Sequence, residues 1–266
     1  MNIAENARQK FLEDYRYIRH AEGRGSDQSD YYRALPWCDK SDPNAAMWDI
    51  RSKTYSYFLK NIFEPLEKRA GRPLDVLDLG AGNCWLSHRL SLRGHRVVAV
   101  DIFNDDRDGL QAARHYPTTF QIVEADFDHL PLPAKDFDLA IFNASFHYSV
   151  DFVQTLSEVR RCLRLSGSFA ILDTPVYRVK EHGTRMVEEK HAAFVERYGF
   201  PSDALPSIDF LDIGTLKTLH TSLKVDWEIL KPWYGWQWHL RPVKAFLKRR
   251  RPPSKFWILM GKFQAL

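Results

Sequence analysis

The stretch that decides the fold reads Val76-Leu-Asp-Leu-Gly-Ala-Gly-Asn-Cys-Trp-Leu86. Its first residues are typical of a buried strand, and Gly80 and Gly82 let the backbone turn sharply and approach a ligand closely. A helix that follows such a turn presents unpaired backbone N–H groups at its start. The stretch therefore predicts a nucleotide-type ligand at a strand–loop–helix turn.

The spacing of this stretch argues against two common nucleotide sites. A dinucleotide site needs a third glycine three residues after Gly82, and Trp85 stands there, which is too large for close packing of helix on strand. The sequence also lacks a G-x-x-x-x-G-K-[ST] phosphate loop. NAD and ATP are therefore disfavoured as ligands.

Strand-like and helix-like segments alternate around the glycine stretch. We expect strands over 75–79, 96–100, 120–124, 138–142 and 168–172. We expect helices over 84–92, 106–115 and 152–165, the last with Gly167 as its cap. This alternation predicts a parallel sheet that is covered by helices on both faces.

The two ends of the chain differ from this pattern. Apolar periodicity predicts helices over 2–20 and 47–70 before the sheet, with a polar loop between them, and helices over 186–198 and 211–223 after it. Strand-like runs at 225–230 and 256–260 predict an antiparallel hairpin at one edge of the sheet.

Acidic residues stand at the ends of the second and third predicted strands. Asp101 lies 23 residues after Asp78, and a carboxylate there can accept from two ribose hydroxyls at once. Asp126 offers an acceptor for an exocyclic amine, with the ring of Phe127 beside it. Adenosine without phosphate fits this set. We expect Asp78, at the end of a buried strand, to order the glycine loop by accepting backbone N–H bonds.

These motifs resemble those of class I S-adenosylmethionine-dependent methyltransferases, in particular the group with quinone C-methyltransferases and many small-molecule methyltransferases. The resemblance covers about Leu74 to Leu172. It rests on Val76-Leu-Asp-Leu-Gly-Ala-Gly82, Val98-Ala-Val-Asp101, Ala125-Asp-Phe127, Leu130-Pro-Leu-Pro-Ala-Lys-Asp-Phe-Asp138 and Leu163-Arg-Leu-Ser-Gly167.

The resemblance implies an α/β, Rossmann-like methyltransferase fold. Its sheet would be doubly wound, mostly parallel and seven-stranded, with an antiparallel C-terminal edge hairpin and N-terminal lid helices. The implied division is a helical lid segment over 1–70 and an S-adenosyl-L-methionine-binding domain over 71–266, with a substrate-recognising insertion at about 177–206.

The resemblance also implies roles for single residues. Gly80 and Gly82 would carry the methionine part of the cofactor, Asp101 would hold the ribose with Ile102 against the adenine, and Asp126 with Phe127 would meet the adenine amine. The full cofactor set is Asp78, Gly80, Ala81, Gly82, Asn83, Asp101, Ile102, Asp126, Phe127 and Asn143. One departure is Cys84, where the family often has a further glycine.

The fourth strand leads into Phe142-Asn-Ala-Ser-Phe-His-Tyr148, beside the expected place of the methyl group. The Asn-Pro-Pro-Tyr or Asp-Pro-Pro-Tyr run of adenine methyltransferases does not occur there, which disfavours base methylation. His147 is the best candidate for a general base, with a plain pocket wall as the alternative. In the resembling family N-terminal helices cap the cofactor carboxylate and cover the pocket, which implies this role for Trp48 and Arg51; with Tyr148 they are also the expected substrate contacts. Arg51 also fits a solvated helix charge.

Composition sets the broad class of the protein. Of 266 residues, 44% are hydrophobic and 27% are charged, which is typical of a globular chain with a sizeable core. The sequence has no long apolar span or signal-like N-terminus, so we expect a cytoplasmic protein. Cys38, Cys84 and Cys162 form no C-x-x-C pair, so neither a disulfide framework nor a metal site is indicated.

The C-terminal part is basic. From Lys231 onward nine residues are basic and none is acidic. Over Arg241 to Lys262 these cations alternate with apolar residues, which predicts weak contact with an anionic membrane surface. The alternatives are a solvated run at Lys248 to Arg251 or contact with nucleic acid, which the lack of a base-reading module disfavours. The run Trp233 to His239 is expected to pack on the edge hairpin.

The function expected from these features is methyl transfer from S-adenosylmethionine to a small, apolar or aromatic acceptor. Two other classes stay open. A nucleic-acid methyltransferase is suggested by the basic tail, and a non-catalytic cofactor-binding protein is compatible with the same fold.

Overall fold

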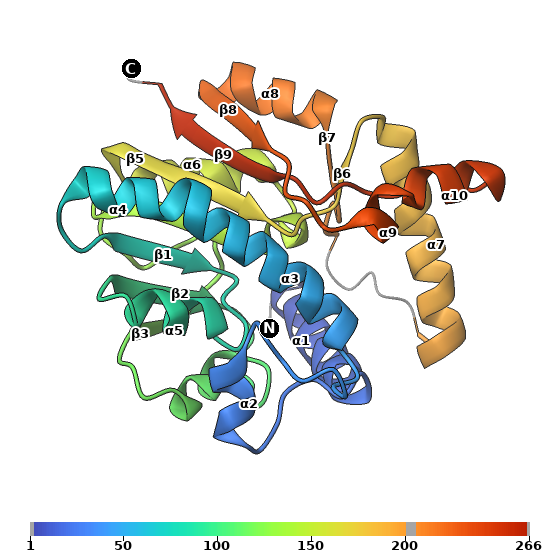
Figure 1. The fold of residues 1–266 in the computed structure, drawn as a ribbon, viewed down its shortest axis with the longest axis horizontal. Helices are drawn as coiled ribbons and strands as arrows, with labels where there is room; N and C mark the ends of the chain where they lie inside the picture. The colour runs from blue at the N-terminus through green and yellow to red at the C-terminus, as the bar shows by residue number, and fades with distance from the viewer. Residues whose placement is uncertain (1–2, 201–205, 265–266) are drawn as a thin grey trace.

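Seven strands within the described residues, 3–200 and 206–264, form one sheet in the order β3-β2-β1-β4-β5-β9-β8, as Figure 1 shows for this computed structural model. The strands are β1 (Asp75–Leu79), β2 (Arg96–Asp101), β3 (Gln121–Glu124), β4 (Phe137–Asn143), β5 (Leu163–Leu172), β8 (Val225–Leu230) and β9 (Ile258–Phe263). Strands β1 to β5 pair in parallel, and β9 pairs antiparallel with both β5 and β8. The mostly parallel sheet and its antiparallel edge hairpin are therefore confirmed.

The order of the sheet reverses at β1. The chain adds β2 and β3 on one side of β1 and then crosses to place β4 on the other side, so that Leu77 pairs with Val98 on β2 and with Ala140 on β4. Loops that leave β1 and β4 at their carboxyl ends therefore diverge to opposite faces of the sheet. A crevice forms at such a switch point, and ligands of open α/β sheets bind there.

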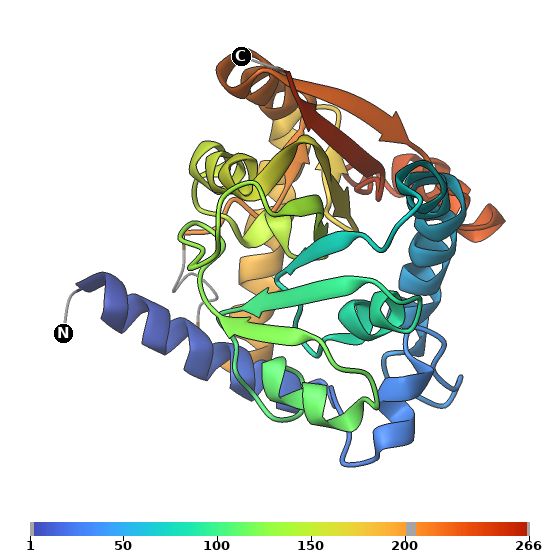
Figure 2. The same ribbon diagram turned by 90° about the vertical axis from the view of Figure 1, so that its left-hand side faces the viewer.

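Helices cover both faces of the sheet (Figure 2). One face carries α3 (Ala45–Phe58), the π-helical turn η1 (Leu59–Phe63), α4 (Glu64–Ala70) and α5 (Trp85–Ser91), and the other carries α6 (Phe152–Cys162) and α8 (Ile213–Leu223). The fully buried strand β1 serves both layers, because Val76 packs under the first group and Leu77 and Leu79 under the second. Because both of its faces are buried, β1 has apolar residues at successive positions, Val76 and Leu77, and does not alternate between apolar and polar ones.

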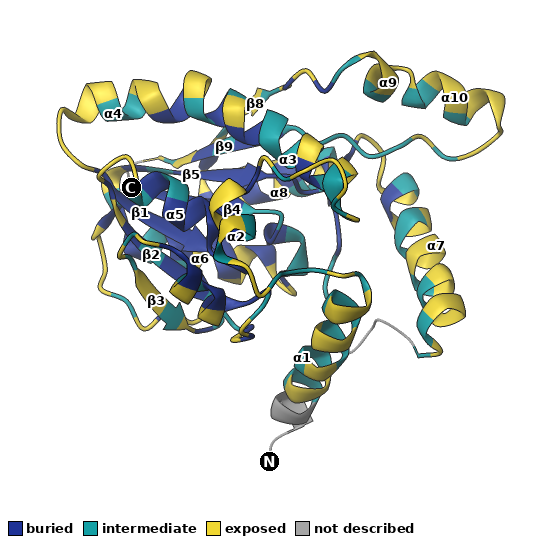
Figure 3. Cartoon of the chain, turned by 60° about the horizontal axis from the view of Figure 1, so that its bottom comes forward, coloured by how far each residue is buried: buried dark blue, intermediate teal, exposed yellow. Residues whose placement is uncertain are grey.

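Two long helices lie outside these layers, α1 (Ile3–Ala21) and α7 (Lys180–Tyr198), as Figure 3 shows. Helix α3 and the turn η1 belong to the expected lid segment 1–70, yet Phe58 and Phe63 share their core with Val76 of β1. Within that segment, α1 is the long helix that stands clear of the sheet. The expected ranges 1–70, 177–206 and 71–266 each include residues outside the described ones, namely 1–2, 201–205 and 265–266.

The end of the helix predicted over 152–165 is wrong. Helix α6 ends at Cys162, and β5 begins at Leu163, which is buried and pairs with Phe137. Leu165 is 84% exposed and so cannot continue the buried face of the helix. Gly167 is not a helix cap but lies within β5, where an added Cβ would come within 3.1 Å of the carbonyl oxygens of Arg164 and Phe137.

The helix predicted over 106–115 is also wrong in its first half. Only the 3₁₀ helix η2 (Leu110–His115) forms there. Gly109 is extended, with φ −118° and ψ −166°, and the N–H of Leu110 donates to the carbonyl of Phe103 at 3.0 Å. The chain therefore folds back at Gly109, and helical turns begin only at Leu110.

Several short elements occupy stretches that the sequence pattern did not resolve. They are α2 (Ser29–Ala34), η3 (Phe146–Tyr148), α9 (Trp236–His239), α10 (Arg241–Leu247) and the parallel pair β6 (Val176–Tyr177) and β7 (Leu211–Asp212). Helix α7 also begins six residues before the predicted start at Met186. None of the helices in the described part of the chain is long and apolar enough to cross a membrane.

Candidate functional site

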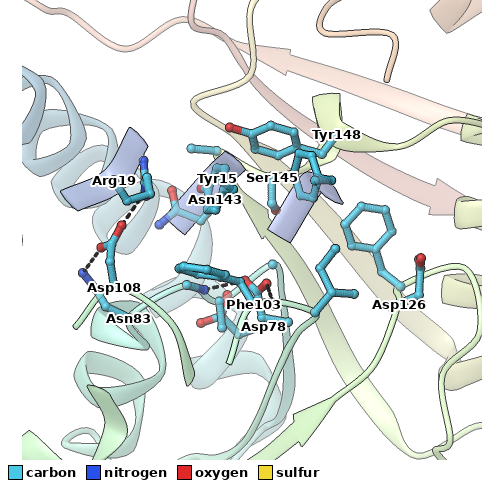
Figure 4. Close-up of a pocket in the computed structure, with 18 of the residues that line it drawn as sticks. Tyr15, Arg19, Asp78, Asn83, Phe103, Asp108, Asp126, Asn143, Ser145 and Tyr148 are labelled. Atoms are coloured by element: carbon cyan, nitrogen blue, oxygen red, sulfur yellow. Dashed lines mark hydrogen bonds and ion pairs between the residues drawn. The ribbon is translucent and has the colours of Figure 1, made fainter. Parts of the chain in front are cut away.

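A cavity of about 750 Å³ opens where the sheet reverses its order, at the carboxyl ends of β1, β2 and β4 (Figure 4). Loops that follow β1 to β4 form its wall together with side chains of α1 and α3. The wall includes all of the residues expected to bind the cofactor: Asp78, Gly80, Ala81, Gly82, Asn83, Asp101, Ile102, Asp126, Phe127 and Asn143. The fold thus brings these residues together, and their part in binding stays a prediction.

The glycine loop has the geometry that its sequence suggests. The N–H groups of Gly80 and Ala81 donate to the carbonyl of Val100 at 2.8 and 3.0 Å, which fastens the loop to β2. Gly80 has φ +72° and Gly82 has φ +53°, conformations that favour glycine. Cys84 also lies in this region, with φ +63°. The position where the resembling family has a further glycine therefore keeps the glycine conformation here, at the expense of local strain.

Asp101 joins the glycine loop to the loop after β2. One carboxylate oxygen accepts from the N–H of Gly82 at 2.7 Å, and the other accepts from the N–H of Phe103 at 2.8 Å. Burial raises the pKa of Asp101, and these two hydrogen bonds together with the charge of Arg19 act in the opposite direction. Each oxygen keeps a further lone pair, so the carboxylate can still accept from a diol in the cavity.

Asp78 does not bind the glycine loop as expected. One oxygen accepts from the hydroxyl of Ser87 on α5 at 2.7 Å, and the other is buried and has no hydrogen-bond partner among the described residues. Burial raises the pKa of Asp78 to about 7. Since Asp78 lies on the cavity wall, the unsatisfied oxygen is available to a ligand donor.

The loop after β3 forms the far wall of the cavity. The carboxylate of Asp126 accepts from the N–H of Asp128 at 3.0 Å, which closes a short turn. The ring of Phe127 stands edge-on to that of Phe142 on β4, with 5.7 Å between ring centroids. An apolar ring and an acidic side chain thus lie side by side at this end of the cavity.

Helix α1 covers the cavity, and this was not anticipated at the level of single residues. Tyr15 stands edge-on to Phe103, with 5.0 Å between ring centroids. Arg19 pairs with Asp108 at 2.5 Å, and the amide of Asn83 donates to the same carboxylate at 3.2 Å (Figure 4). These contacts fasten α1 to the loops after β1 and β2. The apolar period of α1 indicates that it has a buried face, but it does not indicate which surface that face covers.

Arg51 lies on the cavity wall, as expected, but Trp48 does not. The guanidinium of Arg51 stands over the Trp48 ring at 5.1 Å, and it has no ion pair or side-chain hydrogen bond within the described part of the chain. Burial lowers the pKa of Arg51. Trp48 is only 3% exposed and packs edge-on against Trp85, so it supports Arg51 from behind and is not itself placed to contact substrate.

His147 is not part of the cavity wall, whereas the neighbouring Tyr148 is. The carbonyl of His147 accepts from the N–H of Asp209 at 2.9 Å, and its Nδ1 is buried without a partner among the described residues. Burial lowers the pKa of His147 to about 4, while Asp209 acts in the opposite direction. The placement disfavours the general base, and His147 is not a pocket wall either: it is a side chain behind the wall residue Tyr148, with its Nδ1 buried.

Replacement of His147 by glutamine tests this interpretation. The folded protein binds a proton on His147 only near pH 4, whereas the unfolded chain binds it near 6.5. Stability is therefore full above about pH 6.5 and falls as the pH falls toward 4, by on the order of 3 kcal/mol from this group. Urea unfolding between pH 4 and 7 should show a smaller loss in His147→Gln than in wild type, with cofactor affinity unchanged. The same change at the exposed His220 should have no such effect, and equal acid sensitivity of both variants would contradict the assignment.

A second cavity of about 380 Å³ adjoins the first. The two share Phe11, Tyr15, Arg19 and Tyr148, so α1 and the loop after β4 separate them. The far side of the second cavity is formed by α7, with Lys190, Ala193, Phe194, Arg197 and Tyr198. The walls of both cavities mix aromatic and charged side chains, and the wall of the second includes Asp14, Arg24 and Asp209 beside its aromatic rings.

The described ranges, 3–200 and 206–264, contain no group of three or more His, Cys, Asp or Glu side chains placed to hold a metal ion.

Comparison with known proteins identifies relatives of the central part of the chain. Residues 77–171 match the family model described as a methyltransferase domain. Malonyl-[acyl-carrier protein] O-methyltransferase of Pseudescherichia vulneris is 34% identical over 102 residues, which make up 37% of this chain and 38% of that protein. The chain thus matches well under half the length of this curated relative.

Solved structures share the fold over most of the chain. The methyltransferase in a complex with the Trm112 activator of Haloferax volcanii has a TM-score of 0.59 and 19% identity, covering 88% of this chain and 98% of that one. The plantazolicin methyltransferase BpumL, solved with a monoazolic desmethylPZN analog and S-adenosylhomocysteine, has a TM-score of 0.53 and 12% identity, covering 89% and 96%. At these identities the similarity concerns the fold.

Proposed function

We propose that this chain, whose residues 77–171 match a methyltransferase domain, is a class I enzyme that transfers a methyl group from S-adenosylmethionine to a small apolar or aromatic acceptor. The observation that carries the proposal is the meeting of the glycine loop, Asp101 and Asp126 in one cavity at the switch point of the sheet. The relatives named above are methyltransferases, and BpumL was solved with the product form of this cofactor.

The residues of the cavity fit the parts of S-adenosylmethionine. Asp101 suits the ribose hydroxyls, and Asp126 with Phe127 suits the adenine. The buried, unsatisfied oxygen of Asp78 suits the ammonium group of the methionine part. The guanidinium of Arg51, which has no ion pair with any described residue, suits its carboxylate. The cavity is also of the size usual for cofactor sites, roughly 300–1,000 Å³.

When bound, S-adenosylmethionine supplies a methyl group that is already activated on a sulfonium centre. The chain's own task is then mainly to align the acceptor and exclude water. Helix α1 does the second, because Phe11 and Tyr15 cover the cavity and Arg19 fastens the helix to Asp108. Tyr148 lies between the two cavities and is placed to orient an acceptor toward the first one.

The second cavity is the proposed acceptor site. Its aromatic side chains Phe11, Tyr15, Phe194 and Tyr198 suit a ring, and its volume of about 380 Å³ suits a small molecule. Its charged side chains, among them Arg24, Lys190 and Asp209, suit polar substituents on that ring. Helix α7 lies within the expected insertion 177–206, which supports its role in substrate recognition. The division into a 1–70 lid and a 71–266 domain and the cytoplasmic location stay predictions of the sequence.

Binding and turnover can be tested separately. Calorimetry with S-adenosylmethionine and S-adenosylhomocysteine should give one site per chain, unaffected by EDTA. Incubation with a panel of aromatic hydroxy, amino and activated-carbon compounds should then give a methylated product and S-adenosylhomocysteine by mass spectrometry. Lack of cofactor binding would contradict the proposal. Binding without transfer to any member of a broad panel would favour the non-catalytic class, and transfer only to RNA or DNA would favour the nucleic-acid class.

A further inference from the structure

The helices α9 and α10 carry an apolar stripe that faces away from the protein. Trp236, Leu240, Val243 and Leu247 follow one another at spacings of four, three and four residues, which places them on one side of a helix. They are 75%, 47%, 54% and 75% exposed. Phe246, next to the stripe, is 81% exposed. Exposed apolar side chains gathered in this way mark an interaction surface.

The outward direction of this stripe is fixed by contacts on the opposite side. We call residues 233–250 the arm, which extends beyond the sheet in Figures 1 and 3. Tyr234 is buried at its base, and its hydroxyl donates to the carbonyl of Phe256 at 2.8 Å. Arg241 stacks on the Trp238 ring at 3.2 Å and donates to the carbonyl of Ser254 at 2.6 Å. The arm therefore cannot turn its apolar stripe inward without losing these contacts.

The arm also carries unpaired positive charge. Lys244, Lys248, Arg249 and Arg250 are exposed and make no ion pair with any described residue. The sequence has no acidic residue after position 230. Arg251, which the sequence pattern groups with this run, has a different role, because it pairs with Glu189 of α7 at 2.6 Å and donates to the hydroxyl of Tyr177 at 2.9 Å. Arg251 thus holds the arm to α7. The cations without an ion-pair partner among the described residues are therefore Lys248, Arg249 and Arg250 of the run, together with Lys244.

We propose that the arm is a reversible docking surface for an anionic lipid bilayer. A bilayer interface accepts an apolar stripe into its headgroup boundary and pairs flanking cations with anionic headgroups, so it satisfies both features at once. A phosphate backbone would pair with the cations but leave the apolar stripe in water. A second copy of the chain would bring two strongly basic arms together. The proposal goes beyond the methyl-transfer function and does not depend on it.

The test is co-sedimentation of the full chain with vesicles of phosphatidylcholine alone and of phosphatidylcholine with about a third phosphatidylserine. One variant removes the stripe, with Trp236, Leu240 and Val243 each changed to serine. Another removes the charge, with Lys244, Lys248, Arg249 and Arg250 each changed to glutamine. Matched controls make the same kinds of change on other exposed surfaces: Leu92→Ser with Leu165→Ser, and glutamine at Lys68, Arg69, Lys217 and Lys224.

Each cation near an anionic surface multiplies the partition coefficient by about five. We therefore expect wild type and both controls to bind the anionic vesicles at low salt, more weakly at high salt, and both arm variants to lose at least about tenfold in partitioning. Far-ultraviolet circular dichroism and S-adenosylhomocysteine titration should show the arm variants folded and unchanged at the cavity.

Three results would overturn the proposal. The first is failure of wild type to bind anionic vesicles at low salt, or equal binding by the arm variants. The second is a dimer in sedimentation velocity that the stripe variant dissociates, which would assign the surface to a second copy. The third is stronger binding of the arm to RNA than to anionic vesicles at physiological salt, lost in the charge variant.

Discussion

Asp101→Ala is expected to weaken binding of S-adenosylhomocysteine at least about 100-fold, which calorimetry can measure. The substitution removes an acceptor for two ribose hydroxyls, and hydrogen bonds to a charged group contribute about 1.5–3 kcal/mol each. It also releases the N–H groups of Gly82 and Phe103, which the carboxylate holds at 2.7 and 2.8 Å. The glycine loop and the ribose site are therefore lost together.

The conservative change Asp101→Asn should lose nearly as much. Both carboxylate oxygens accept from backbone N–H groups, so an amide must turn its NH₂ group toward one of these donors. Asp106→Ala, in the same loop but on a side chain that is 59% exposed, is the matched control and should keep full affinity. Wild-type affinity in a folded Asp101→Ala variant would remove the basis for the cofactor assignment.

The central sheet could be predicted because its signals are local. Strand β1 is a short apolar run that is followed by glycines, and β2, β3 and β4 are each bounded by turn residues. The errors arose where a distant backbone partner changed the outcome. The N–H of Leu110 donates to the carbonyl of Phe103, which folds the chain back before η2, and Phe137 pairs with Leu163 and draws it into β5. Neither partner is visible from periodicity.

The candidate site divides in the same way. Residues that follow a strand directly, such as Gly80, Asp101 and Asp126, could be placed because parallel strands end at one edge of the sheet. Arg19 and Asp108 are 89 residues apart and meet only because α1 crosses that edge. His147 looked suitable by chemistry and position, but the turn η3 directs Tyr148 and not His147 to the cavity. Sequence motifs therefore predict the cofactor half of the site better than the acceptor half.

Gly80→Ala is expected to have the largest effect on stability of any single methyl group added to the loop after β1. A Cβ at this position would lie 2.2 Å from Cβ and 2.8 Å from Oγ of Ser145. Ser145 is buried, and its hydroxyl donates to the carbonyl of Leu79, so it has little room to move. Left-handed strain of about 1–2 kcal/mol and overpacking of about 1–3 kcal/mol should together lower the free energy of unfolding by about 2–5 kcal/mol. Denaturant unfolding measures this loss.

Gly71→Ala separates the two contributions to that loss. Gly71 has φ +61°, close to the +72° of Gly80, but an added Cβ there meets nothing within 4 Å. Its variant should therefore lose only the strain, about 1–2 kcal/mol, and keep cofactor affinity. Adding Ser145→Gly to Gly80→Ala removes the clashing side chain and should restore part of the lost stability. Equal losses of unfolding free energy in Gly80→Ala and Gly71→Ala would contradict this explanation. The left-handed conformation of Gly80 alone, and not its close contact with Ser145, would then require glycine at that position.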